Sequence, residues 1–152
     1  MEKELISEFA KIVRASTIKR LVKVPENYEN WKIKSDSLSF AEITKHLIDI
    51  DNWILSKIQD PSFKSIETQT ARIEFCKREK YLDLIDELQE SLVKKPEFID
   101  KMTEEDLQIT IYDDSLSKNI PTSLFILRRN LDHEIHHRGQ IALYLNMLKQ
   151  NK

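Results

Sequence analysis

The chain carries, near its C-terminal end, the stretch His133-Glu134-Ile135-His136-His137-Arg138-Gly139-Gln140. Three of its four histidines fall within five positions here. On a helix, residues four apart lie about 40° from each other, so His133 and His137 point in nearly the same direction. Neutral imidazoles at this spacing can bind one divalent ion with little loss of side-chain freedom. His136 lies about 60° away from His133 and is the weaker candidate ligand.

The remaining histidine, His46, lies in the middle of a second helical apolar stripe that includes Ile43, Ile50 and Trp53. Burial of an unpaired imidazole there would be costly. If the two helices face each other, they form one buried three-histidine site from His46, His133 and His137, with an open fourth coordination position. Structural histidines are the alternative. We favour a metal site because it accounts for all three residues at once.

The residues His133-Glu134-x-x-His137 also match the zinc-peptidase signature H-E-x-x-H. Peptidases of this kind take a third ligand from further along the chain, and no His, Asp or Glu follows His137. Glu134 is expected instead to form a surface ion pair with Arg138, four residues later. The pattern therefore argues against a peptidase.

Length and composition predict one soluble, helix-rich domain spanning residues 1–152. The net charge is −2 and acidic and basic residues are interleaved, so we expect no nucleic-acid partner. The longest uninterrupted apolar run, Leu124-Phe125-Ile126-Leu127, is too short to span a membrane. The N-terminal residues, Met1-Glu2-Lys3-Glu4, contain no signal-peptide core. These features predict a cytoplasmic protein.

The chain has one cysteine and one glycine. The single Cys76 excludes a disulfide framework and a Cys-x-x-Cys site. Phosphate-binding loops of the Walker and dinucleotide types need several glycines, so the sequence excludes those classes of nucleotide-dependent enzyme. Gly139 lies inside a predicted helix and points away from the two histidines. Its expected use is close approach by another helix or a second subunit, and neutral drift is the alternative.

Hydrophobic periodicity predicts four long helices, near residues 3–22, 40–59, 70–95 and 122–149. The first should pack one face, consisting of Leu5, Ile6, Phe9, Ile12, Val13 and Ser16. The second begins with a capping box in which Ser39 is the N-cap and Glu42 the third helical residue, and it ends at Asp60-Pro61. Its buried side carries Ile43, His46, Leu47, Ile50, Trp53 and Ile54.

The third helix should bury Phe75, Tyr81, Leu82, Ile85, Leu88 and Leu92, and Pro96 should interrupt it. Residues 107–112 alternate with a period of two and form the one strand-like segment predicted. The fourth helix is apolar on two sides. One side consists of Leu124, Leu127, Leu131, Ala142 and Leu145; the other, with a polar centre, of Ile126, Asn130, His133, His137, Gln140, Tyr144 and Leu148. A mixed stripe of this kind is typical of a metal site in the core of a helical bundle.

The four predicted helices, the histidine early in the second and His-x-x-x-His-Arg-Gly-Gln in the last together resemble the DinB-like family of metal-dependent enzymes. The resemblance spans the whole chain, and its specific part is Lys45-His46-Leu47 with Trp53, then His133, His137 and Arg138-Gly139-Gln140. It implies an all-α four-helix bundle with long crossover connections and frequently a homodimer. It also implies a divalent ion, nickel, zinc or a similar metal, held by His46, His133 and His137. Some branches of the family transfer a low-molecular-weight thiol such as bacillithiol, mycothiol or glutathione to an electrophile.

Three neutral histidines leave a bound ion its full charge and at least one exchangeable position. Such an ion lowers the pKa of bound water to about 7 and deprotonates a bound thiol. The leading hypothesis is metal-assisted nucleophilic chemistry on a small substrate, with a thiol preferred because of the resemblance and with Gln140, Tyr144 and Asn130 as supporting groups. A metal-dependent hydrolase is the first alternative. A non-catalytic metal or small-ligand binding module, with His136 as a fourth ligand, is the second. Three imidazoles suit Zn or Ni, and also Fe, Mn or Cu, so the metal stays open.

Overall fold

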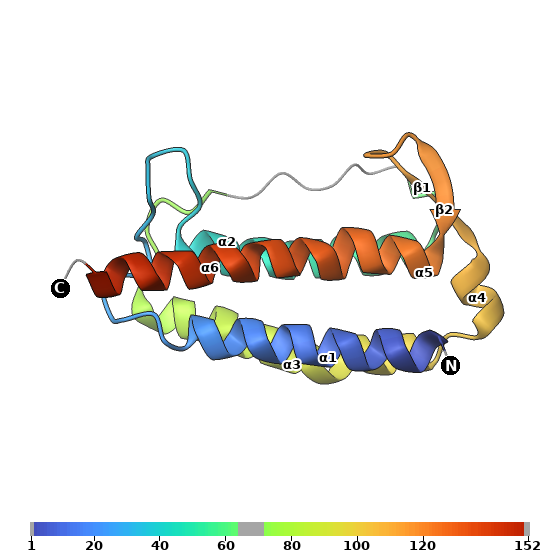
Figure 1. Cartoon of the computed structure of the whole chain (residues 1–152), viewed down its shortest axis with the longest axis horizontal. Helices are drawn as coiled ribbons and strands as arrows, with labels where there is room; N and C mark the ends of the chain where they lie inside the picture. Colours follow the sequence, from blue (N-terminus) through green and yellow to red (C-terminus); the bar gives the residue numbers. More distant parts are fainter. Residues whose placement is uncertain (1, 64–71, 151–152) are drawn as a thin grey trace.

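The computed structural model describes residues 2–63 and 72–150 and is a bundle of long helices with a small hairpin at one end (Figure 1). The helices are α1 (Glu2–Leu21), α2 (Phe40–Gln59), α3 (Arg78–Asp100), α4 (Glu104–Gln108), α5 (Thr122–Phe125), the π-helix η1 (Ile126–Asp132) and α6 (His133–Gln150). The strands are β1 (Thr110–Asp113) and β2 (Lys118–Pro121). Helices α5, η1 and α6 follow one another without a break and form one rod. The predicted all-α fold is confirmed.

The α1 helix and the α5–η1–α6 rod run in one direction, and α2 and α3 run in the other (Figure 1). Helix α1 packs against α3 and α6, while α2 packs against α3 and the rod. Because α2 and α3 are parallel, α2 ends and α3 begins at opposite ends of the bundle, which agrees with a long crossover connection between these two helices. Within the described residues, no helix is both long enough and apolar enough to cross a membrane.

Helix α2, which carries His46, begins where the sequence predicted. The Ser39 hydroxyl accepts the Glu42 backbone N–H, and the Glu42 carboxylate accepts the Ser39 backbone N–H, so both halves of the capping box are present. The helix ends at Gln59, with Asp60 as its C-cap. Its predicted apolar side is buried in the core. This burial fixes the direction in which His46 points.

Helix α3 differs from its prediction at both ends. It begins at Arg78, because the backbone N–H and C=O of Cys76 are both bound by the side chain of Asn30, which holds this segment outside the helix. Phe75 and Leu82 are exposed, and residue 70 lies outside the described residues. Pro96 lies inside the helix and does not end it. Burial of Ile99 in a cluster with Ile6 offsets the backbone hydrogen bond that the proline removes.

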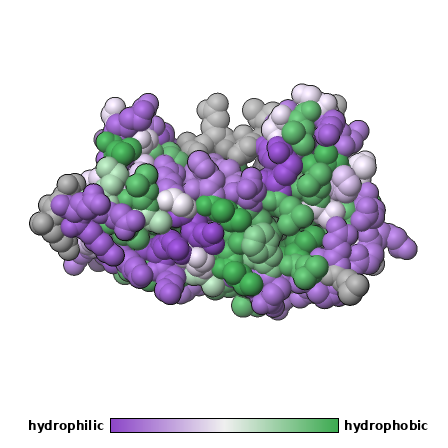
Figure 2. Space-filling model, viewed as in Figure 1, coloured by the Kyte–Doolittle hydropathy of each residue, from purple (hydrophilic) through white to green (hydrophobic). Residues whose placement is uncertain are grey.

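The predicted packed face of α1 is wrong. Leu5, Phe9 and Ile12 are 73%, 40% and 56% exposed, and of the predicted set Ile6 and Val13 are buried. The helix is rotated so that its buried side includes three polar residues, Ser7, Arg14 and Thr17. Leu124 of the rod is likewise exposed. Apolar side chains gather on this α1–α6 face of the molecule, toward the end where α1 begins (Figure 2).

A strand was predicted at residues 107–112, and the structure has one nearby that begins three residues later. Leu107 and Gln108 belong to α4, and β1 starts at Thr110. Strand β1 pairs in antiparallel register with β2, which was not predicted, with Ile111 opposite Ile120. Both isoleucines are buried against Trp53 and Phe125. The hairpin therefore packs on the end of the bundle beside α2 and the rod.

Candidate metal centre

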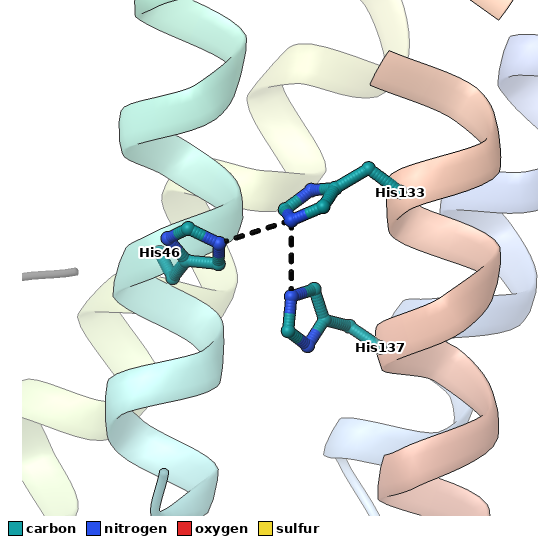
Figure 3. Close-up of side chains that lie close together, drawn as sticks. All are labelled: His46, His133 and His137. Atoms are coloured by element: carbon teal, nitrogen blue, oxygen red, sulfur yellow. Dashed lines mark hydrogen bonds between the residues drawn. The ribbon is translucent and has the colours of Figure 1, made fainter. Parts of the chain in front are cut away.

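The three histidines singled out in the sequence meet between α2 and the rod (Figure 3). The Nε2 atom of His133 lies 3.1 Å from Nε2 of His46 and 3.2 Å from Nε2 of His137. One ligand atom from each ring lies within 4.8 Å of the other two. His46 and His137 are buried, and His133 is half-buried. Residues almost ninety positions apart are thus brought together, as predicted.

The spacing of these nitrogen atoms fits a divalent ion. Imidazole nitrogens bind zinc at about 2.0–2.1 Å, and two such ligands at a tetrahedral angle are about 3.3 Å apart. The two Nε2–Nε2 separations of 3.1 and 3.2 Å are close to this value. Three imidazoles are also a ligand set that Zn and Ni accept. His46, His133 and His137 could therefore hold one metal ion.

The cluster keeps His133 and His137 neutral, as metal ligands must be. Burial, and after it the charges that the neighbouring imidazoles would carry, together lower the pKa of His133 from 6.5 to about 3. Burial also lowers the pKa of His137 to about 4, although the hydrogen bond to Gln140 acts in the opposite direction. Three imidazoles in mutual contact cannot all be charged at neutral pH. The neutral rings of His133 and His137 each keep one nitrogen lone pair that a metal ion can accept.

Gln140 and Tyr144, predicted as supporting groups, form a chain of hydrogen bonds behind His137. The Nδ1 atom of His137 lies 3.0 Å from Gln140 Oε1, an acceptor, so this nitrogen carries the proton and Nε2 presents its lone pair to the cluster. The Gln140 amide in turn donates to the Tyr144 hydroxyl at 3.1 Å. The Tyr144 ring is buried and packs edge-on against Trp31 and Phe40. A rigid aromatic group therefore anchors the orientation of one candidate ligand.

Two other residues of the quoted stretch lie outside the cluster. His136 is exposed, with its ring centroid 5.1 Å from that of His137, and it does not belong to the three-histidine group. Gly139 is exposed, and a Cβ atom added there would meet no described atom within 4 Å. The expectation that a second helix of the chain approaches Gly139 is therefore wrong for the described residues. The expectation of a second subunit stays a prediction.

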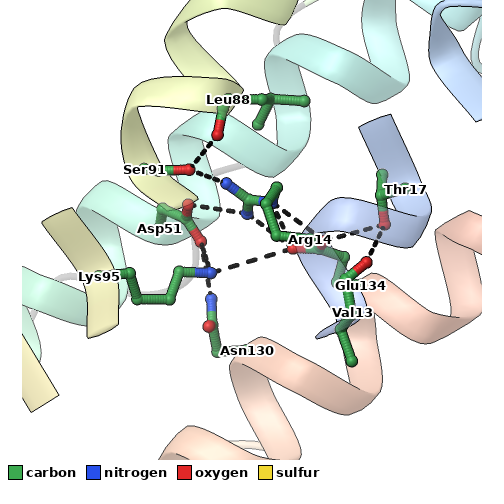
Figure 4. Close-up of polar contacts among 9 residues, drawn as sticks. All are labelled: Val13, Arg14, Thr17, Asp51, Leu88, Ser91, Lys95, Asn130 and Glu134. Atoms are coloured by element: carbon green, nitrogen blue, oxygen red, sulfur yellow. Dashed lines mark hydrogen bonds and ion pairs between the residues drawn. The ribbon is translucent and has the colours of Figure 1, made fainter. Parts of the chain in front are cut away.

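Glu134 does not form the surface ion pair predicted with Arg138. It is buried, and its carboxylate accepts from Arg14 Nε at 3.1 and 3.0 Å and from Arg14 Nη2 at 2.6 Å (Figure 4). The Thr17 hydroxyl lies 2.9 Å from the same carboxylate. About 100° of helix rotation separates Glu134 from His133, so it points toward α1, away from the cluster. The glutamate of the H-E-x-x-H string is thus held by a guanidinium, which argues further against a peptidase.

Arg14 and Glu134 belong to a larger buried charge network that the sequence analysis missed. Arg14 Nη2 also donates to Asp51 Oδ2 at 2.8 Å, and Lys95 Nζ lies 2.7 Å from Asp51 Oδ1. Asn130, predicted as a supporting group, donates to Asp51 Oδ1 at 2.9 Å. The available signal was Arg14 among the apolar residues of the first helix and Asp51 beside Ile50. This signal was missed because α1 has a second apolar stripe, which the prediction assigned to the core.

A second cationic group lies one turn before His133. The Arg129 guanidinium is 5.0 Å from the ring centroid of Trp53, and its Nη1 donates to Asp113 and Asp114, each at 2.7 Å. These contacts tie the β1–β2 hairpin to η1. They also fix the Trp53 ring two turns along α2 from His46. The hairpin and the histidine cluster are therefore attached to the same two helices.

Comparison with known proteins identifies the family. The DinB family model matches residues 2–148. The chain belongs to the DinB family. A crystal structure of a DinB-like protein from Bacillus subtilis superposes with a TM-score of 0.68 at 21% identity, covering 96% of this chain and 92% of that one, and it supports the fold. No curated protein sequence matches the chain significantly. Family membership and the three-histidine cluster agree with a divalent-metal-binding DinB protein.

We predict that Gln140→Leu weakens metal binding about tenfold while the protein stays folded, because His137 loses the acceptor that fixes its tautomer. The measurement is a competition titration of Zn²⁺ against a chromophoric chelator, with circular dichroism as the test of folding. Gln89→Leu, at an exposed position of α3, is the matched control and should bind like the wild type. Equal affinity in all three proteins would contradict the role assigned to Gln140.

A second prediction concerns acid stability. Burial disfavours ionisation of Asp51, but Lys95 and Arg14 more than offset this effect and hold the pKa of its carboxyl at about 2, below the ordinary 3.8. A depressed folded-state pKa gives stability that is present above about pH 4 and is lost as the pH falls toward 2, here about 2 kcal/mol. Urea unfolding of metal-free wild type and Asp51→Asn should therefore give a stability difference that shrinks across this interval.

The control for this measurement is Asp86→Asn, at an exposed position of α3, which should differ from the wild type by the same small amount at every pH. A difference between wild type and Asp51→Asn that stays constant from pH 5 to pH 2.5 would refute the assignment.

Proposed function

We propose that this DinB protein is a metal-dependent enzyme that activates a low-molecular-weight thiol for attack on a small electrophile. The observation that carries the proposal is the convergence of His46, His133 and His137, which place one ring nitrogen each within 4.8 Å of one another. A zinc or nickel ion bound by them would have an open position, at which it would lower the pKa of a thiol. Thiols stay reduced in the cytoplasm, so we propose that compartment for the activity.

The side chains of the protein orient the proposed ligands and add no charge to the metal site. The histidines contribute no charge, so a bound ion keeps its full positive charge toward a thiol. Gln140 holds His137 in the tautomer that presents Nε2, and Tyr144 holds Gln140. Both are proposed to act by positioning a ligand. The buried environment of the cluster strengthens electrostatic interactions within it, since water screens them less.

A metal-dependent hydrolase, in which water replaces the thiol, uses the same three histidines and remains the alternative. Its support is that a His₃ site with an open position also activates water. The non-catalytic binding module requires a fourth protein ligand. His136 has been its candidate, and the exposure of that side chain weighs against this role. The presence or absence of a thiol requirement separates the two enzymatic proposals.

We predict that the zinc- or nickel-loaded protein accelerates conjugation of several thiols with a chromogenic electrophile such as a nitroaryl halide. His46→Ala should reduce the rate at least a hundredfold and abolish stoichiometric metal binding, because two imidazoles remain. The measurement is initial rate against thiol concentration, with metal content determined by mass spectrometry. Turnover of ester substrates without any thiol would favour the hydrolase. Bound metal with neither activity across a broad panel would refute both.

We propose further that the protein forms a homodimer through the α1–α6 face. The support is the exposure of Leu5, Phe9 and Ile12 in one stripe of α1, with Leu124 and Gly139 exposed on the rod. An apolar stripe of this kind is costly to leave in water and is typical of a surface that is buried on association. Gly139, which has open space above it, permits close approach of a second backbone.

For this surface we predict that Ile12→Glu converts a dimer into a monomer without loss of helicity. Sedimentation velocity at micromolar concentration gives the mass in solution, and circular dichroism checks the fold. Val93→Glu places the same charge at a similarly exposed apolar position of α3 and should leave the dimer intact. A wild-type protein that sediments as a monomer at all concentrations would end the proposal.

A further inference from the structure

The buried charge network draws on all four long helices (Figure 4). Arg14 comes from α1, Asp51 from α2, Lys95 from α3 and Glu134 from α6. All four side chains are buried, and their two positive and two negative charges cancel. Arg14 is the centre of the network, since its guanidinium contacts the carboxylates of both Asp51 and Glu134.

Burial of four charges is a poor way to stabilise a bundle. Removal of charges from water carries a large penalty, and apolar residues of similar volume often serve as well or better. Buried ionic groups have one well-attested use, which is to fix the register of helices, because a shifted arrangement leaves charges unpaired. The arrangement of this network therefore points to a geometric role.

The network and the histidine cluster share the same two helices. Asp51 follows His46 by five residues on α2, and Glu134 directly follows His133 on α6. Arg14 bridges Asp51 and Glu134 with bonds of 2.8 and 2.6 Å. Asn130, one turn before Glu134, adds a direct bond of 2.9 Å from the rod to Asp51. Rotation or sliding of either helix would break these bonds, and it would move the histidine on that helix by a comparable distance.

The histidine contacts tolerate little movement. Metal–nitrogen bonds vary by about 0.2 Å, whereas a slip of one helical turn is about 5.4 Å. The apolar contacts around the cluster are non-directional and fix register less tightly than hydrogen-bonded charges do. We propose that Arg14, Asp51, Lys95 and Glu134 act as positioning residues that set the register of α2 against α6 and so preform the three-histidine site. This inference rests on the proposed metal centre, and it assigns Glu134 a positioning role in place of the catalytic one its motif suggests.

The first test replaces the whole network by apolar residues: Arg14→Met, Asp51→Leu, Lys95→Met and Glu134→Leu together. Because no charge is left unpaired, this variant should fold. We expect its Zn²⁺ affinity to fall at least tenfold and the visible spectrum of its Co²⁺ form to lose the intensity of a regular tetrahedral site. Met102→Ala, a core truncation near the hairpin end of the bundle, is the control for general destabilisation and should keep wild-type affinity.

A second variant, Glu134→Gln, keeps the shape of the side chain and covers the case in which the fourfold variant fails to fold. We expect a smaller loss of affinity, about threefold to tenfold, together with reduced turnover. Reduced turnover with unchanged affinity and an unchanged Co²⁺ spectrum would assign Glu134 to the chemistry and overturn the proposal.

A metal-free measurement separates this inference from the proposed function. Long-range ¹H–¹⁵N spectra report the tautomer of each imidazole. In the wild type, His137 should be fixed with the proton on Nδ1, and in Glu134→Gln its two nitrogens should move toward averaged shifts. If the wild type binds no metal, the proposed function fails while this readout still decides the positioning role. Identical tautomers and identical affinities in wild type and variants would overturn it.

Discussion

The interaction between Arg14 and Glu134 is the constraint on which the arrangement of the helices depends. Three donor–acceptor contacts of 2.6 to 3.1 Å join a guanidinium on α1 to a carboxylate on α6, and both groups are buried. Loss of either partner would break a buried ion pair, which costs about 3–5 kcal/mol. The rotation of α1 follows from this pair, since Leu5, Phe9 and Ile12 remain exposed so that Arg14 and Thr17 can point inward.

Two polar clusters of opposite character therefore occupy the centre of one small bundle. The histidine cluster carries no carboxylate, and its ring nitrogens converge to separations of 3.1 and 3.2 Å. The charge network is fully ionic, and its two carboxylates are both met by cations. The first is suited to receive a cation from outside, and the second has no net charge to offer one. Their separation on the helix surface, about 100° between His133 and Glu134, keeps the carboxylate out of the candidate coordination sphere.

Much of the site could be predicted from the sequence because the relevant signals are local. The spacing of His133 and His137 fixes their common direction on a helix, and the capping box at Ser39 and Glu42 fixes the start of the helix that carries His46. Predicting that the two helices converge required a further inference, namely that His46, on an apolar stripe, needs a partner. Gln140 lies one turn from His137, so its hydrogen bond was within reach of the same argument.

The parts that were wrong depend on contacts between residues distant in the chain. Helix α1 has apolar residues on two sides, and local periodicity cannot decide which side faces a partner that lies 120 residues away. The start of α3 depends on Asn30, which binds both backbone groups of Cys76 from another loop. Pro96 ends many helices, but burial of Ile99 beyond it outweighs one missing hydrogen bond.

The H-E-x-x-H string shows that the roles of motif residues depend on the helices that pack against them. In a peptidase the two histidines and the glutamate serve one metal site, so the helix must present both faces to the same cavity. Here His46 approaches the histidine face from α2, and Arg14 approaches the glutamate face from α1. The Glu134 carboxylate, which could act as a base, is already bound by the Arg14 guanidinium. Burial of Arg14 lowers its pKa, but Asp51 and Glu134 raise the pKa by more, so the guanidinium stays charged. Reassigning the glutamate would require moving an entire helix, because Arg14 cannot leave Glu134 without also breaking its ion pair with Asp51.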